Sequence, residues 1–269
     1  MHLVNDRINR IPPLSALGII PLLLLLLTVE ASAQPGISVS GILIPDSTIR
    51  SGDITVRIWQ HPRMTIVEIP DTLVFLYLPR NDLPLDSIAR KNNLRGIVNC
   101  SFFDGVRGNA RHAGWLSLYG ERVTPLLDDR QLSHIVRFSG TSRKIECVPV
   151  KSFVPTRDQA VLEFQTGPLV IDSGKVRDDL ITRSINGSTP HTRTLLAVLD
   201  RRQPFFVTVT DRVSLSELGA ILRRISIFQH GRLDVVNLDG GSSVALYLRD
   251  LSGLNYNAGD RLPILIGFH

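Results

Sequence analysis

Sulfur-containing residues are scarce in this chain, whose 269 residues include two cysteines and two methionines. The cysteines, Cys100 and Cys147, have no histidine at ligand spacing nearby, which argues against a zinc site. In an oxidising compartment the two thiols could pair, or both could be buried and separate, because a sequence gives no distance between them. His191 has no second histidine to share a metal, and no acidic loop has regular calcium-ligand spacing. The sequence therefore assigns no cofactor and leaves a divalent cation such as calcium open.

Dense clusters of basic residues are also missing, although the chain as a whole is basic. Its formal net charge is +5 and its isoelectric point is near 9.6. This balance is compatible with acidic ligands or an anionic envelope surface. Nucleic-acid binding is disfavoured, because no run of Lys and Arg is interleaved with aromatic residues.

Long apolar runs are confined to the N-terminus. Arg7 and Arg10 precede the leucine-rich stretch 14–29, and Ala31-Ser32-Ala33 matches the small-residue rule for signal cleavage. Residues 1–33 therefore predict a signal peptide, and we expect an exported protein, periplasmic or secreted. The alternative, an uncleaved anchor, is disfavoured because the run is short and Pro21 interrupts it. No later segment predicts a membrane span, and the oligomeric state stays open.

After the leader the sequence predicts a tail over residues 34–52, where Ser, Gly and Pro are frequent, and one domain over 53–269. Alternation of apolar and polar residues from Asp53 onward predicts a strand, and many short apolar runs separated by turn residues follow it. Two helices are predicted, over 84–94 and 215–228, the second with a capping box formed by Ser214 and Glu217. The pattern favours an α+β fold of mixed, mostly antiparallel sheets with a few helices.

The stretch 235–243 is the most unusual in the chain. A β-branched apolar run leads to Asp239, which is followed by Gly240, Gly241, Ser242 and Ser243. Glycines allow a backbone to approach a ligand, and amide and hydroxyl groups can cradle phosphate or sugar oxygens. The alternative is a plain hairpin whose polar groups satisfy the turn.

Three other polar residues stand next to apolar strands. Asn99 ends a predicted strand and could bond a sugar or cap the strand end. Asp104 could supply a second carboxylate or belong to an Asp-Gly turn, and Arg193 could bind phosphate with its planar fork or form an ordinary ion pair.

Several of these stretches, taken in order, resemble the phosphodiester glycosidase domain family from about residue 95 to 269. The matching segments are Asn99–Asp104, Thr166–Val170, Asp172–Lys175, Thr192–Thr194 and Asn237–Ser243. Two departures stand out: Cys100 and Ser101 replace glycines of the first segment, and Ser242 replaces a glycine of the last. Side chains at these three positions could narrow the pocket or change which sugar enters.

The resemblance implies a hydrolase that cleaves a sugar 1-phosphodiester and releases free sugar, such as N-acetylglucosamine, and a phosphomonoester. Glycosidic cleavage usually needs an acid and a second carboxylate, but a phosphate leaves readily, so binding it matters more than protonating it. Asp239 is then the first catalytic candidate and Asp104 the second. The substrate-binding candidates are Asn99, Gly167, Arg193, Thr194, Gly240, Gly241, Ser242 and Ser243.

Two other functions are compatible with the same residues. One is a carbohydrate-binding or phosphoglycan-binding envelope protein without catalytic activity, which the three departures keep open. The other is a nuclease-like or phosphatase activity that breaks the P–O bond rather than the C–O bond.

Overall fold

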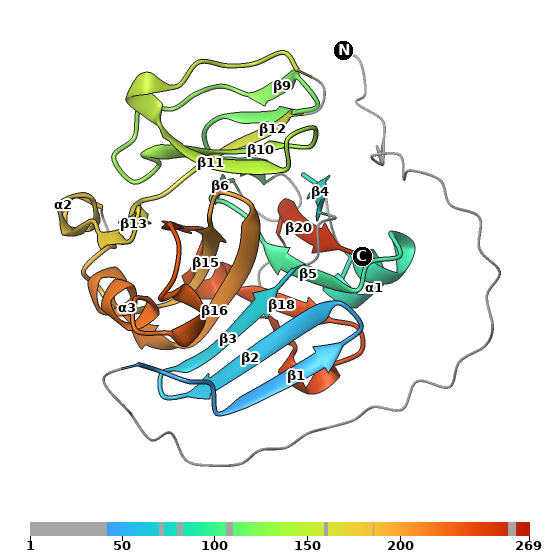
Figure 1. Cartoon of the computed structure of the whole chain (residues 1–269). Coiled ribbons are helices and arrows are strands. Elements are labelled where there is room, and N and C mark those ends of the chain that lie inside the picture. Colours follow the sequence, from blue (N-terminus) through green and yellow to red (C-terminus); the bar gives the residue numbers. More distant parts are fainter. Residues whose placement is uncertain are drawn as a thin grey trace.

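The computed structural model describes residues 42–69, 73–79, 83–105, 110–158, 161–184, 186–257 and 262–269. The predicted signal peptide lies outside these residues. Within them the chain folds into antiparallel sheets with a few short helices, so the predicted α+β class is confirmed (Figure 1). No helix of the described residues has the length and apolar character needed to cross a membrane.

The largest sheet has eight strands, in the order β1-β2-β3-β16-β15-β17-β13-β14, and each neighbouring pair is antiparallel. Its strands are β1 (Ser47–Ser51), β2 (Ile54–Gln60), β3 (Arg63–Glu68), β13 (Leu169–Asp172), β14 (Lys175–Val176), β15 (His191–Leu199), β16 (Gln203–Val213) and β17 (Leu233–Asn237). The central strands β15 and β17 are buried along most of their length, in agreement with their continuous apolar runs.

Two five-stranded sheets complete the fold. The first has the order β11-β10-β12-β8-β9 and consists of β8 (Leu116–Leu118), β9 (Glu121–Thr124), β10 (His134–Ser139), β11 (Lys144–Pro149) and β12 (Val161–Thr166). The second has the order β19-β18-β5-β20-β4 and consists of β4 (Leu73–Tyr77), β5 (Gly96–Asn99), β18 (Ala245–Leu248), β19 (Tyr256–Asn257) and β20 (Ile264–Phe268). The short strands β6 (Phe103–Asp104) and β7 (Arg111–His112) pair with each other.

The helices cover individual sheets. Helix α1 (Leu85–Lys91) packs its Ile88 and Ala89 into an apolar cluster with β5 and β20. Helix α3 (Leu215–Leu222) packs on the large sheet, and Ser214 caps it as predicted, since Ser214 Oγ accepts a hydrogen bond from Glu217 N at 3.2 Å. The other helical turns are α2 (Asp178–Ile181) and the 3-10 turns Val150–Ser152, Ser226–Phe228, Gly241–Ser243 and Ser252–Leu254.

Two predicted boundaries are wrong because contacts distant in sequence decide them. The helix predicted over 215–228 ends at Leu222, since Leu43 forms a bridge with Ile225 and bonds Arg224 O and Ser226 N on either side of it. The tail predicted up to residue 52 ends earlier, since Ser47–Ser51 pair with Ile54–Ile58 as the edge of the large sheet.

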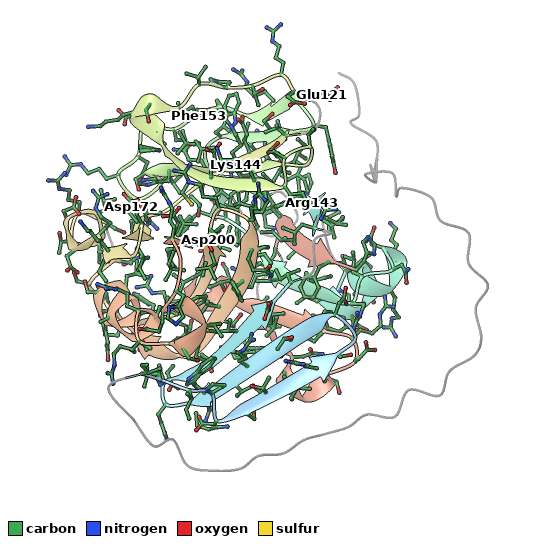
Figure 2. All side chains as sticks on the ribbon, in the orientation of Figure 1. Glu121, Arg143, Lys144, Phe153, Asp172 and Asp200 are labelled. Atoms are coloured by element: carbon green, nitrogen blue, oxygen red, sulfur yellow. The ribbon has the colours of Figure 1, made fainter. Side chains whose placement is uncertain are left out.

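One apolar cluster unites the sheets. It contains Val56 and Leu196 of the large sheet, Val136 and Phe164 of the sheet β8–β12, and Ile266 of β20. The sheet β8–β12, at the top of Figure 1, also meets the turn between β15 and β16, where Ile145 N donates to Arg201 O at 2.7 Å. The labelled Lys144 and Asp200 mark this junction in Figure 2. The sheet β8–β12 is thus joined to the large sheet by apolar packing and by a backbone bond.

Candidate functional site

The turn that carries Asp239 is held by two different sheets. Immediately after β17, Leu238 N donates to Thr194 O at 2.9 Å, and Asp239 N donates to Cys100 O at 3.0 Å. The half-buried carboxylate is also oriented, because Asp239 Oδ1 accepts from Gly240 N at 2.8 Å. The structure therefore fixes this carboxylate where the ends of β5, β15 and β17 meet.

Glycines are needed in this turn because β15 approaches it closely. A Cβ atom on Gly240 would lie 2.8 Å from Thr192 O, and Gly241 has a φ of +62°. Thr192 Oγ1 donates to Gly241 O at 3.0 Å, which fastens the turn to β15. Ser242 is exposed and Ser243 is buried. The Gly-Gly-Ser-Ser segment is thus a 3-10 turn packed against β15, and it presents Ser242 to solvent.

Asn99 organises this turn from inside the protein. Its Nδ2 donates to Asp239 O at 2.8 Å, and its Oδ1 accepts from Thr194 Oγ1 at 2.7 Å and from Ala245 N at 3.0 Å. Asn99 is 1% exposed and Thr194 is fully buried. The side chains of Asn99 and Thr194, which the sequence suggested as ligand contacts, therefore bond other parts of the protein. This is the alternative in which Asn99 caps a strand end.

Arg193 is a buried cation without a carboxylate partner among the described residues. It is 4% exposed, and its Nη2 donates to the carbonyls of Asn186 at 2.6 Å and Thr189 at 2.8 Å. Its buried Nε has no hydrogen-bond partner among the residues that the structure describes. Burial lowers the pKa of its guanidinium to about 10, so the group stays charged at neutral pH. A buried charge in this state favours the arrival of an anion.

The strand register places Arg193 beside the Asp239 turn. Leu195 pairs with Asn237 across β15 and β17, and continuing this antiparallel register sets position 193 opposite position 239. In agreement, a Cβ atom on Gly240 would lie 3.7 Å from Arg193 Cδ. The chain positions of the predicted cation and the predicted carboxylate are therefore adjacent.

Asn237 is a polar residue that sequence reasoning did not single out as a site residue. It lies on the same sheet face as Arg193, since it faces Leu195, two residues further along β15. Its Nδ2 donates to Gly167 O at 3.1 Å, whereas its buried Oδ1 has no partner. An amide that directly follows the apolar pair Val235-Val236, two residues before Asp239, is the signal that could have revealed it.

Gly167, a predicted substrate contact, acts as a joint between β12 and β13. Its N donates to Asn237 O at 3.2 Å, and a Cβ atom here would lie 2.6 Å from Gln131 O. Its φ of +147° also favours glycine. Backbone proximity to residues 131 and 237 accounts for the glycine without a ligand.

Asp104 is not joined to the other candidates. It is exposed on β6, and its Oδ1 accepts from Gly105 N at 3.0 Å, as the Asp-Gly turn alternative predicts. Among the described residues, no hydrogen bond or ion pair links Asp104 to Asn99, Arg193 or Asp239. Its predicted role as a second carboxylate therefore lacks a supporting contact.

The two replaced glycines of the first family segment do not point at a pocket. Cys100 is fully buried in the shared apolar cluster, where burial raises the pKa of its thiol. Ser101 is 2% exposed and donates to Gln165 O. Cys100 and Cys147 are both free thiols. Both side chains face the interior, and an effect of residues 100 and 101 on which sugar enters stays a prediction.

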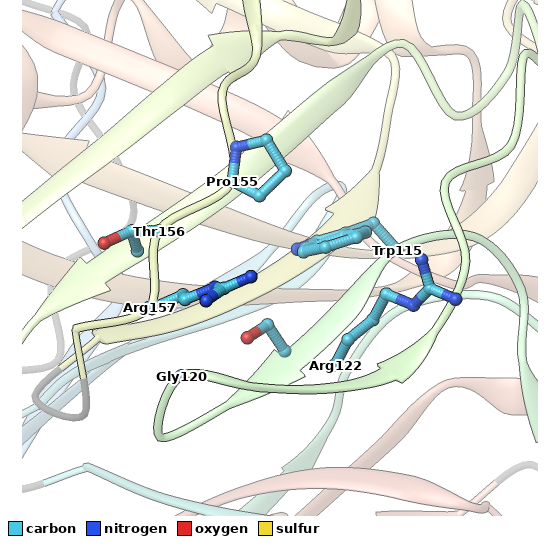
Figure 3. Close-up of a pocket in the computed structure, with 7 residues that line it drawn as sticks. Trp115, Gly120, Arg122, Pro155, Thr156 and Arg157 are labelled. Carbon is cyan, nitrogen blue, oxygen red and sulfur yellow. The ribbon is translucent and has the colours of Figure 1, made fainter.

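The described residues hold no group of three or more His, Cys, Asp or Glu side chains placed to bind a metal. His191 lies at the start of β15, and burial, together with the charges of Arg193 and Arg212, lowers its pKa. None of the candidate residues lines the cavity of about 370 Å³ that the structure has in the sheet β8–β12, next to Trp115 (Figure 3). The candidate site is thus an oriented carboxylate beside an unpaired arginine.

Solved structures of other proteins share the fold of this chain. The chain is similar in fold to the catalytic domain of zebrafish N-acetylglucosamine-1-phosphodiester alpha-N-acetylglucosaminidase, which is described as auto-inhibited by its pro-peptide. The identity is 12%, the TM-score is 0.56, and the match covers 83% of this chain and 81% of that one.

Two further solved structures share the fold. A hypothetical protein from Synechocystis matches with 14% identity, a TM-score of 0.50 and 82% of this chain covered, and the chain spans 60% of that protein's length. An exported protein from Burkholderia pseudomallei K96243 matches with 9% identity and a TM-score of 0.51, over 77% of this chain and 74% of that one.

No curated protein matches the sequence directly. The sequence profile of the phosphodiester glycosidase family, in contrast, matches residues 92–268, which is more than half of the chain and includes Asn99, Arg193 and Asp239. The chain therefore belongs to the phosphodiester glycosidase family.

Proposed function

We propose that this protein is an exported hydrolase that cleaves a sugar 1-phosphodiester at its C–O bond. The observation that carries the proposal is Arg193, a buried guanidinium without a described carboxylate partner, beside the turn that orients Asp239. Family membership supports the reaction class, and the predicted signal peptide supports export.

In this mechanism Arg193 binds the phosphate, because a guanidinium offers several donors to phosphate oxygens and its buried Nε has no other partner. The negative charge that grows on the departing phosphate is then stabilised by a cation already in place. Because its pKa stays near 10, the guanidinium keeps its charge throughout the neutral range.

Asp239 acts on the sugar side of the same bond. Its carboxylate accepts a proton from the attacking water, whose oxygen bonds to the anomeric carbon as the bond from that carbon to the phosphate oxygen breaks. The products are the free sugar and a phosphomonoester, which carries the bonding electron pair away. The hydrogen bond from Gly240 and the anchoring of Asp239 O by Asn99 hold the carboxylate for this step.

The test is hydrolysis of an α-N-acetylglucosamine 1-phosphodiester by the purified protein in ¹⁸O-labelled water. We expect free sugar to appear and the label to enter the sugar. Label in the phosphate would instead indicate P–O cleavage, and saturable binding without any released sugar would indicate a binding protein on the same fold. Either result overturns the proposal.

A further inference from the structure

A second concave region lies in the sheet β8–β12. Its cavity of about 370 Å³ is within the range of roughly 300–1,000 Å³ typical of small-molecule sites. Its lining comes from the β8–β9 hairpin and from the segment before β12: Trp115, Ser117, Gly120, Arg122, Pro155, Thr156 and Arg157. None of these residues belongs to the candidate site around Asp239.

The cavity carries positive charge. Arg122 and Arg157 are exposed, and neither side chain has a hydrogen bond or ion pair with any described residue. No lining residue is acidic. The buried carboxylate of Glu163 lies beneath, but it bonds Trp115 Nε1 at 3.0 Å and pairs with Arg137 at 2.6 Å, so its charge is matched. Both lining guanidinium groups are therefore free to bind an anion.

The walls of the cavity are preformed. The Trp115 ring packs edge-on against Phe153 with centroids 5.4 Å apart, and its bond to Glu163 fixes its orientation. Gly120, with a φ of +79°, lets the hairpin approach the facing segment, since a Cβ atom there would lie 2.6 Å from Arg157 O. In Figure 3 the guanidinium groups of Arg122 and Arg157 flank the Trp115 indole.

We propose that this cavity is a second binding site, for a sugar unit that carries an anionic group. Arginine forks match phosphate and carboxylate oxygens, and the exposed Pro155 ring offers apolar surface to a pyranose, next to the 7% of Trp115 that remains exposed. The half-buried Thr156 offers a hydroxyl at the edge of the cavity for a sugar hydroxyl group. The site would hold a charged unit of a glycan, and binding there does not require hydrolysis at Asp239.

Trp115 supplies a direct readout of binding. The only other tryptophan, Trp59, is buried in the apolar cluster under α3, so Trp59→Phe leaves Trp115 as the single reporter. In this background we titrate N-acetylglucosamine 6-phosphate, glucuronate, neutral N-acetylglucosamine and inorganic phosphate and follow the fluorescence. We expect saturable changes with one or both anionic sugars, at affinities at least ~10-fold tighter than for the neutral sugar or for phosphate alone. The response to the two anionic sugars distinguishes a phosphate from a carboxylate ligand.

The arginines are tested with a matched control. Arg122→Gln with Arg157→Gln should weaken anionic-sugar binding at least ~10-fold. Arg50→Gln with Arg202→Gln removes the same charge from two other exposed side chains and should leave binding unchanged. Equal effects of the two double variants, or equal binding of neutral and anionic sugars, would overturn the proposal. If inorganic phosphate bound as tightly as the anionic sugars, the proposal that the site recognises a sugar would be overturned.

Two further variants separate this site from folding and from hydrolysis. Arg157→Lys keeps the charge but loses the fork, so it should bind more weakly than the parent and more tightly than the double glutamine variant. Asp239→Asn should leave the Trp115 titration unchanged. If Asp239→Asn abolished the titration, the ligand would be bound at the Asp239 turn and the second site would be refuted, whatever the outcome of the hydrolysis assay.

Discussion

Two arginine-bearing regions of this molecule differ in how their cations are held. On the large sheet Arg193 is buried and bonded to loop carbonyls, whereas Arg122 and Arg157, at the cavity of the sheet β8–β12, are exposed and have no hydrogen bond or ion pair with any described residue. Burying a cation costs desolvation free energy, and binding an anion at that cation offsets the cost. A cation held in place in this way can stabilise negative charge that develops in a transition state. Exposed arginines cost little and adapt to a ligand. The contrast separates the region proposed for hydrolysis from the region proposed for recognition.

The largest effect is expected at the carboxylate of the first region. Asp239→Asn keeps the shape but cannot accept a proton, so kcat for sugar 1-phosphodiester hydrolysis should fall by about 10²–10⁴-fold. Steady-state release of free sugar measures it, with Asp104→Asn as the control at an exposed carboxylate. Unchanged turnover in Asp239→Asn would show that another residue accepts the proton from the attacking water.

Next comes the scaffold of that region. Asn99→Ala removes the side chain that bonds Asp239 O, Thr194 Oγ1 and Ala245 N, and it leaves buried partners unsatisfied, so it should lower the free energy of unfolding by about 3 kcal/mol. Thr194→Val, which deletes one of these bonds, should cost about 1 kcal/mol. Urea denaturation compares them. A loss below ~1 kcal/mol in Asn99→Ala would contradict the anchoring role.

The arginine of the first region should govern affinity. Arg193→Gln should weaken binding of a non-hydrolysed phosphodiester analogue about 30-fold, the equivalent of ~2 kcal/mol for a charged hydrogen bond. Binding of the free sugar should change much less, and titration calorimetry with both ligands measures the difference. Equal losses for the two ligands would show that Arg193 supports the loop at Asn186 and Thr189 rather than the phosphate.

A smaller effect concerns the pH dependence of stability and two buried histidines, His134 of β10 in the sheet β8–β12 and His112 of β7. Burial lowers the pKa of His112 and of His134 to about 4, below the usual value near 6.5. The unfolded chain therefore takes up protons first, so stability is complete above about pH 6.5 and falls as the pH drops toward 4. At pH 5.5 each histidine should cost about 1.4 kcal/mol.

The check on this linkage is the pH dependence of unfolding in His134→Asn. Its stability should decline less between pH 7 and 5.5 than that of the parent protein. His230→Asn, at an exposed position, should follow the parent curve. Parallel curves for all three proteins would show that His134 does not titrate as its burial requires.

Much of the local structure followed from the sequence. Apolar alternation predicted β2, and the Ser214 capping box predicted the start of α3. These features depend on neighbours along the chain. The end of α3 and the strand β1 did not follow, because their partners, Leu43 and β2, decide them through pairing.

The sequence by itself determined the family and singled out Asp239 and Arg193, since a carboxylate and a cation at the ends of apolar strands are visible in one dimension. Only the tertiary structure decided which polar atoms already have hydrogen-bond partners within the protein. It showed that Asn99 and Thr194 bond each other, that Asp104 stands apart, and that Arg193 has an unpaired Nε. The reason is physical: a side chain's hydrogen bonds are made with strands far away in sequence, so their occupancy appears only when the sheets have assembled.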